Sequence, residues 1–161
     1  MRDEVDTLVE AWRRERADLD LGPVEVFSRI TRLARHLDLA RRQAFTDHDI
    51  ESWEFDVLAA LRRAGGDYEL SPGRLLKETL VTSGTMTNRV DRLAARGLVE
   101  RLPDPNDRRG VLVRLTPDGR AAVDGAFEAL LEAERQLLGD LPAKEHKQLA
   151  ALLRTLMAQF S

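Results

Sequence analysis

Hydrophobic positions along the chain recur at the intervals of amphipathic helices. In the first segment Val5, Leu8, Val9 and Trp12 fall at i, i+3, i+4 and i+7, a spacing that gathers them on one helix face. Charged and polar residues fill most of the positions between them. The same spacing predicts further helices whose hydrophobic stripes begin at Phe27, Trp53, Met86, Val123 and Leu149.

Glycine and proline mark where these helices are expected to begin or end. The pair Gly22-Pro23 separates the first two helices, with the proline near the start of the second. Gly65-Gly66 ends the third helix, and Gly97 stands where a left-handed residue closes another. Thr116-Pro117 and Leu141-Pro142 open the last two helices.

The middle of the chain predicts two short helices followed by a hairpin. Ser71-Pro72 supplies an N-cap and a first-turn proline for a helix that runs to about Thr79, and Thr82 with Ser83 caps the next one. The segments LVERL and VLVRLT have the pattern of short strands, and PDPNDRRG between them has the composition of a loop. We therefore expect a helix-turn-helix with a wing.

The predicted fold class is mainly α with a small β-hairpin wing. We expect a single domain over residues 1–161, in which the winged helix-turn-helix occupies about residues 50–116. The flanking helices, about residues 3–48 and 117–160, carry apolar stripes, and those of the C-terminal helices predict a partner. A content of 43% hydrophobic and 5% aromatic residues agrees with a helical protein that has a substantial core.

Composition narrows the classes of function. The formal net charge is −3, so overall charge does not indicate a nucleic-acid partner, yet residues 71–114 carry nine Lys or Arg against five Asp or Glu. The absence of cysteine excludes disulfides, thiol nucleophiles and thiolate metal sites. No run of 18 apolar residues and no hydrophobic leader occurs, so we expect a cytoplasmic protein without a membrane partner.

The segment TNRVDRLAARGLVERLPDPNDRRGVLVRLTPDGR resembles the signature of the MarR family of winged-helix regulators. The family's wing pattern is an Asp, one residue, an Arg, five residues and then Leu-Thr, and Asp107, Arg109, Leu115 and Thr116 match that spacing. The resemblance covers almost the whole chain. It implies a transcriptional regulator, a repressor, that binds a pseudo-palindromic operator in double-stranded DNA as a homodimer. The resemblance also implies that the flanking helices, about residues 3–48 and 117–160, form a helical dimerisation region.

The recognition helix can be sorted into faces at 100° per residue. Met86, Val90 and Leu93 define the inner face, which leaves Asn88 and Arg92 on the outer face. A helix in the major groove reads base edges, and a hairpin tip reaches the neighbouring minor groove. We expect DNA contacts from Ser83 and Thr85 at the start of the helix, Asn88 and Arg92 on its outer face, and Arg108 and Arg109 at the wing tip.

Four other residues suggest how DNA binding is controlled. Arg89 lies about 60° from the centre of the inner face, and Asp56, among hydrophobic neighbours, and Arg101 are candidates for a shared internal charge network. Trp12, Asp56, Arg89 and Arg101 resemble the ligand-site residues of the urate-responsive PecS/HucR subgroup of the MarR family. The resemblance implies that a planar anion, urate, stacks near Trp12, engages Arg89, disturbs a pair between Asp56 and Arg101, and releases the DNA.

Two alternatives stay open for these four residues. Tricarboxylates such as trans-aconitate and citrate suit two neighbouring arginines as well as urate does. Alternatively, Trp12 is a core residue of its own helix, and Asp56, Arg89 and Arg101 form a structural ion-pair network.

Other functional classes have weaker support. The chain contains no GxGxxG, P-loop or GxSxG motif, so we expect neither enzyme activity nor a cofactor. His36, His48 and His146 do not have the spacing of metal ligands, so we expect no metal. A helical protein-interaction module without DNA binding would explain the terminal helices, but it would leave the wing unexplained.

Overall fold

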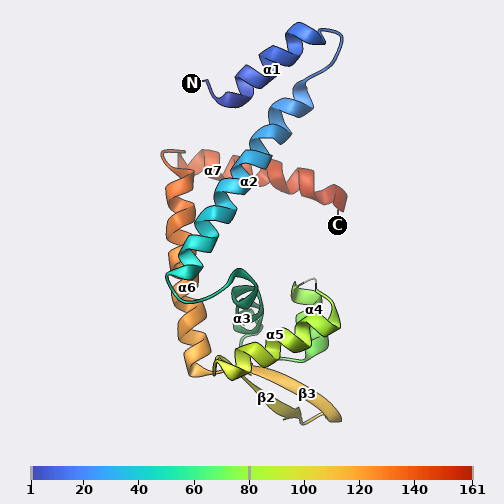
Figure 1. The fold of residues 1–161 in the computed structure, drawn as a ribbon, viewed down its shortest axis with the longest axis vertical. Coiled ribbons are helices and arrows are strands. Elements are labelled where there is room, and N and C mark those ends of the chain that lie inside the picture. Colours follow the sequence, from blue (N-terminus) through green and yellow to red (C-terminus); the bar gives the residue numbers. More distant parts are fainter. Residues whose placement is uncertain (1, 80, 161) are drawn as a thin grey trace. The chain divides into compact units, whose positions relative to one another are not determined.

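A computed structural model describes residues 2–79 and 81–160, with every side chain in these ranges except those of residues 108 and 109. The chain divides into two compact units, Met1–Arg41 and Arg42–Ser161. Each unit has its own cluster of buried hydrophobic residues. Figure 1 traces the elements along the chain.

The first unit contains helix α1 (Glu4–Glu15) and the larger part of α2 (Gly22–Thr46). Val5 and Val9 are buried on α1, and they cluster with Leu21, the residue before α2. Part of the predicted apolar stripe of the first helix is therefore buried in a small core. Helix α2 begins at the predicted glycine-proline pair.

Ion pairs join the two helices of the first unit. Arg29 of α2 places its Nε 2.8 Å from the carboxylate of Asp3 and its Nη2 2.7 Å from that of Asp6. Asp3 is also the N-cap of α1, where its side chain accepts the backbone N–H of Val5. The hydrogen bond from Arg29 lowers the pKa of Asp3, so this carboxylate stays charged to more acidic pH.

The second unit holds the predicted helix-turn-helix and hairpin in the predicted order. Helix α3 precedes a short strand, then α4 and α5 form the helix-turn-helix, β2 and β3 form the hairpin, and two longer helices follow. The bounds are α3 (Ser52–Ala64), β1 (Glu69–Leu70), α4 (Pro72–Thr79), α5 (Ser83–Ala95), β2 (Val99–Asp104), β3 (Asp107–Leu115), α6 (Pro117–Leu138), α7 (Ala143–Met157) and a 3₁₀ turn η1 (Ala158–Phe160).

The sheet has one strand more than the predicted hairpin. Its order is β1-β3-β2 with antiparallel neighbours, and Glu69 of β1 lies opposite Arg114 of β3. The two side chains also form an ion pair in which Nη2 of Arg114 lies 2.6 Å from Oε2 of Glu69. The short strand β1, which comes just before α4 in the chain, therefore pairs with the free edge of β3 at the base of the wing.

The core of the second unit lies between α3, α5 and α6. Val57, Leu58 and Leu61 of α3 are fully buried there. The predicted inner face of α5 is confirmed, since all three of its residues are buried in the same cluster. Residues of α6 complete this core. The buried residues of α5 are Met86, Val90 and Leu93, and those of α6 in this cluster are Val123, Ala126 and Leu130.

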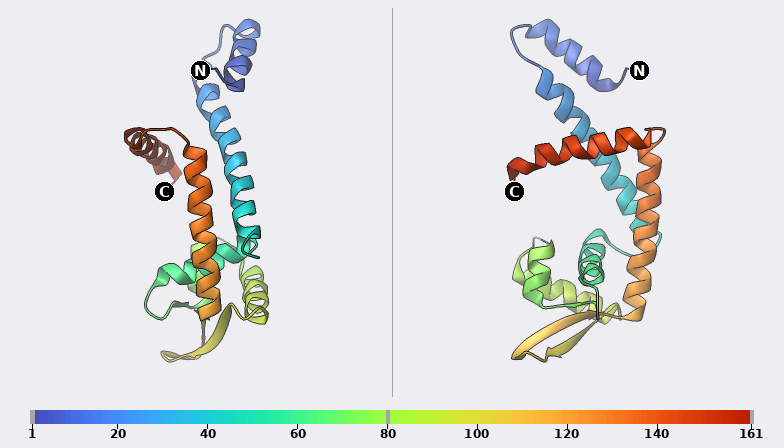
Figure 2. Two further views of the ribbon diagram at one scale, coloured as in Figure 1. Left: turned by 90° about the vertical axis from the view of Figure 1, so that its left-hand side faces the viewer. Right: turned by 180° about the vertical axis from the view of Figure 1, so that it is seen from behind.

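Helix α7 buries no residue in the single chain. Its predicted apolar stripe is exposed, with Leu152 at 66% and Met157 at 61% of full exposure. Figure 2 shows α7 leaving the end of α6 at a steep angle instead of folding back along it. No helix among residues 2–79 and 81–160 is long and apolar enough to cross a membrane.

Hydrogen bonds join the residues just after α5, the predicted recognition helix, to the start of α6. Gly97 has a φ of 71°, the left-handed conformation that the sequence predicts at this helix end. Thr116 caps α6, donating its Oγ1 hydrogen to the carbonyl of Gly97 at 2.7 Å and its backbone N–H to the carbonyl of Leu98 at 3.1 Å. The N–H of Gly119 completes the cap by donating to Oγ1 of Thr116 at 3.0 Å.

We expect Gly119→Ala to destabilise the second unit strongly. A Cβ at Gly119 would lie 1.9 Å from the carbonyl oxygen of Leu98, so the backbone itself would have to move. The free energy of unfolding should fall by about 3 kcal/mol or more, at the upper end for overpacking. Urea denaturation followed by circular dichroism measures the change.

Gly73→Ala is the matched control. Gly73 lies in α4, and a Cβ there meets no atom within 4 Å. Alanine in place of an exposed helical glycine should raise stability by about 0.5–1 kcal/mol. Equal effects of the two substitutions would contradict the close contact between Gly119 of α6 and the backbone of Leu98.

Candidate nucleic-acid interface

The outer face of α5 is the surface that the sequence predicts to read DNA. Ser83, Thr85, Asn88 and Arg92 are all exposed, as predicted. α5 is the next helix in the chain after α4, and its N-cap Thr82 shares a 2.9 Å hydroxyl hydrogen bond with Thr85. The free N–H groups of the first turn and the helix dipole favour anions here. The surface therefore combines an anion-attracting helix start with amide and guanidinium donors.

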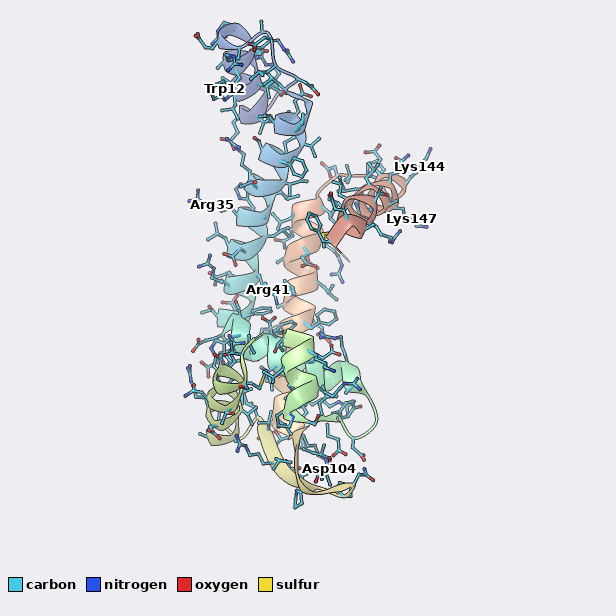
Figure 3. All side chains as sticks on the ribbon, turned by 90° about the vertical axis from the view of Figure 1, so that its right-hand side faces the viewer. Trp12, Arg35, Arg41, Asp104, Lys144 and Lys147 are labelled. Atoms are coloured by element: carbon cyan, nitrogen blue, oxygen red, sulfur yellow. The ribbon has the colours of Figure 1, made fainter. Side chains whose placement is uncertain are left out.

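The wing extends beyond α5 in a tight antiparallel hairpin (Figure 1). Asp104, labelled near the end of the hairpin in Figure 3, accepts the backbone N–H of Asn106 at 2.8 Å. A Cβ at Gly110 would lie 2.8 Å from that of Asp104, so glycine allows the strands to close. The side chains of Arg108 and Arg109 lie outside the described part of the chain, and their predicted DNA contacts stay predictions.

Arg89 is half-buried, which agrees with its predicted place at the edge of the inner face. The contact it makes is with an aromatic ring of α3. Its guanidinium carbon lies 5.4 Å from the centroid of Trp53, and that of Arg92 lies 4.7 Å from the same ring. These three residues line a hollow of about 430 Å³ together with Gly84, Thr85 and Asn88.

The buried carboxylate of α3 is Glu54, whereas Asp56 is exposed. Asp56 is thus not an internal charge in the single chain, and its expected place in a charge network stays a prediction. Glu54 is 1% exposed, and its Oε2 lies 2.6 Å from Nη1 of Arg96 at the end of α5. Asp49 adds its carboxylate and its carbonyl to the same guanidinium. The hydrogen bond to Glu54 raises the pKa of Arg96, so the guanidinium stays charged.

Arg101 pairs with the recognition helix. Its Nη2 lies 2.7 Å from Oδ1 of Asp91, and both side chains are largely exposed. Trp12 is 50% exposed, so it is not a core residue of α1 in the single chain. It belongs to the first unit, whereas Asp56, Arg89 and Arg101 belong to the second. A ligand site made by these four residues, and the expected link between Asp56 and Arg101, remain predictions.

Three residues at the start of α3 contact α5, and their part in this surface was not predicted from the sequence. They are Glu51, Trp53 and Glu54, which meet Arg89, Arg92 and Arg96. One signal was available, because a glutamate at the third position of a helix caps the backbone before it. Glu54 does so by accepting the N–H of Glu51 at 2.9 Å.

The described part of the chain holds no group of three His, Asp or Glu side chains placed to bind a metal ion. The outer face of α5 offers positive charge and hydrogen-bond donors. Guanidinium groups, an amide and hydroxyls point outward from one helix, which suits phosphates and base edges.

Comparisons with known proteins agree with this geometry. The sequence of residues 48–110 matches the family model of the MarR family. The transcriptional regulator PecS of Dickeya dadantii is 37% identical over 150 residues, covering 93% of this chain and 90% of PecS.

The chain belongs to the MarR family. A solved structure of a mutant Escherichia coli MarR in complex with operator DNA has a TM-score of 0.69 at 31% identity and covers 88% of this chain and 96% of that one. The solved structure of Bordetella bronchiseptica BpsR has a TM-score of 0.66 at 33% identity over 81% of this chain and 91% of BpsR. DNA binding by BpsR is regulated by 6-hydroxynicotinic acid.

Membership in the MarR family makes the chain a DNA-binding transcriptional regulator and not an enzyme. The winged helix-turn-helix predicted from the sequence is confirmed by the fold and by these neighbours.

We expect Arg96→Gln to destabilise this MarR-family chain. The substitution leaves the carboxylate of Glu54 buried without its cation, and removing one partner of such a pair costs about 3 kcal/mol. Arg101→Gln is the matched control, since the exposed pair with Asp91 should contribute less than about 1 kcal/mol. Urea denaturation compares the two variants, and equal losses would contradict the dominance of the buried pair.

Proposed function

We propose that the chain is a homodimeric repressor that binds a pseudo-palindromic operator and leaves it when a small anionic ligand binds. The observation that carries the proposal is the exposed outer face of α5, with Ser83, Thr85, Asn88 and Arg92 presented on a rigid helix. The ligand that we favour is urate. Tricarboxylates such as trans-aconitate and citrate are the second candidate.

The place of each residue on α5 or the wing suggests which part of the DNA it contacts. Ser83 and Thr85, next to the free N–H groups at the start of α5, contact phosphates. Asn88 and Arg92 reach base edges in the major groove, where an amide suits adenine and a guanidinium suits guanine. Arg108 and Arg109 enter the minor groove from the wing. Most of the affinity then comes from charge, so it depends steeply on salt.

The homodimer is supported by apolar surface that the single chain leaves exposed. α7 buries none of its residues, and the end of α6 exposes Leu137 and Leu138. Burying one such leucine contributes about 1.5–3 kcal/mol. A second copy is the occupant we propose, because a pseudo-palindromic operator needs two recognition helices related by a two-fold axis. The remaining exposed apolar residues of the second unit include Phe127, Leu149, Leu152, Leu153, Met157 and Phe160.

The anionic ligand is supported by arginines at the edge of the recognition helix. Arg89 and Arg92 lie against Trp53, and Arg101 on the wing pairs with the same helix through Asp91. An anion that engages Arg89 would alter the position of α5 and hence its fit to DNA. Two arginines close together also suit the several carboxylates of citrate or trans-aconitate.

We expect the purified protein to bind the DNA upstream of its own gene in a gel-shift titration, and urate at millimolar concentration to release it. Binding should weaken on the order of 10³-fold between 50 and 200 mM salt. Asn88→Ala should weaken it by about tenfold or more, since a base contact is lost. Arg89→Ala should keep DNA binding and lose the response to urate.

Parallel titrations with citrate and trans-aconitate separate the two ligand classes. Arg135→Ala, which removes an exposed side chain of α6 paired with Glu132, is the control and should respond like the wild type. Release by tricarboxylates alone would replace urate with the second candidate. If no anion weakens DNA binding, the ligand proposal is wrong. The proposal that the chain binds operator DNA would be unaffected.

We expect Leu152→Asp to dissociate the dimer without unfolding the chain. Leu152 is largely exposed on α7, so a charge there costs the monomer little but disrupts an apolar interface. Lys147→Asp, on the opposite side of the same helix, is the control and should stay dimeric. Sedimentation equilibrium measures the association, and a wild-type chain that is monomeric at micromolar concentration would contradict the homodimer.

A further inference from the structure

Trp53 is fixed in place by its neighbour at the start of α3. Its indole Nε1 donates a 2.6 Å hydrogen bond to Oε2 of Glu51. The ring is half-buried and packs against the core of the second unit. The indole therefore presents a rigid face next to the recognition helix.

Arg92 lies against this face and is held by the same glutamate. Its guanidinium carbon is 4.7 Å from the centroid of the Trp53 ring, and its Nη2 is 3.1 Å from Oε1 of Glu51. Both carboxylate oxygens of Glu51 are thus used, one by the indole and one by the guanidinium. A residue of the outer face of α5 is engaged by α3 before any DNA is present.

We propose that Glu51 and Trp53 form a clamp that competes with DNA for Arg92 and so limits the affinity of the protein for its operator. The proposal rests on the proposed function, in which the outer face of α5 reads DNA. Glu51 itself needs no contact with DNA. Its role is to hold Arg92 until a phosphate or a base replaces the carboxylate.

The exposure of the pair makes this exchange feasible. The side chain of Arg92 is 54% exposed and that of Glu51 is 59% exposed, so the ion pair is solvated and weak. The neighbouring pair between Arg96 and Glu54 is buried at the glutamate and is not available for exchange. One arginine of α5 therefore anchors the helix, and another, one turn earlier, is held only loosely.

The cost of opening the clamp sets the size of the effect. An exposed ion pair of this kind changes an equilibrium by up to about fivefold. Glu51→Gln keeps an oxygen for the indole hydrogen but removes the charge that holds Arg92. The backbone N–H of residue 51, which caps onto Glu54, is unchanged by the substitution.

A double-mutant cycle tests the clamp. Operator affinity is measured by fluorescence anisotropy, at one salt concentration, for the wild type, Glu51→Gln, Arg92→Gln and the double variant. We expect Glu51→Gln to tighten binding by about two- to fivefold. Arg92→Gln should weaken binding, and in its background Glu51→Gln should have no further effect, because there is no guanidinium left to release.

A second readout reports on the clamp directly. The chain has two tryptophans, so Trp12→Phe leaves Trp53 as the only indole emitter. DNA should change the emission of Trp53 when Arg92 leaves its ring, and the change should be absent in Arg92→Gln. Thermal unfolding confirms that Glu51→Gln is folded, as expected for an exposed side chain.

The outcomes separate the clamp from the proposed function. Tightening by Glu51→Gln that persists with Arg92→Gln would mean general repulsion of phosphates by the glutamate, and it would overturn the clamp. If Glu51→Gln binds the operator more weakly than the wild type or equally well, the clamp proposal is wrong. Operator binding by the wild type would still support the proposed function. A wild-type chain that binds no DNA would overturn the proposed function and the clamp together.

Discussion

A carboxylate buried at the start of α3 determines how the recognition helix is held. Glu54 is almost inaccessible to water, and a charge in that position is tolerated only with a cation and hydrogen bonds around it. Arg96 supplies the cation from the last turn of α5, and Asp49 holds the far side of the guanidinium. The apolar inner face of α5 is packed into the core, and the directional ion pair at the end of the helix adds a second fixed point.

The arginines of α5 contact partners that range from buried to exposed. Arg96 lies against a buried carboxylate, Arg89 is half-buried against a ring, and Arg92 meets an exposed glutamate. The strength of each contact follows from its access to water. A DNA-binding helix needs both kinds of contact, since anchored charges give it a fixed orientation and solvated charges can change partner at little cost.

Local rules of the chain predicted most of the fold and the faces of the recognition helix. Gly97 and Thr116 mark the boundaries of elements because their conformations depend on a few neighbouring atoms. The pairing of β1 with β3 was not predictable in this way, since a two-residue strand has no period of its own. Periodicity also could not separate Glu54 from Asp56, because the apolar neighbours of both suggest burial, and only the position of Arg96 in three dimensions selects Glu54.

The junction at Thr116 makes α6 a lever arm. The cap hydrogen bonds and the close approach of Gly119 to Leu98 leave little freedom between the end of α5 and the first turn of α6. With 22 residues at 1.5 Å each, α6 is about 33 Å long. A rotation of about 5° at one end therefore displaces the other by about 3 Å. If the proposed homodimer is joined through the far end of α6, small angular changes at that joint would change the spacing of the two recognition helices. DNA with a fixed helical repeat would be sensitive to that spacing.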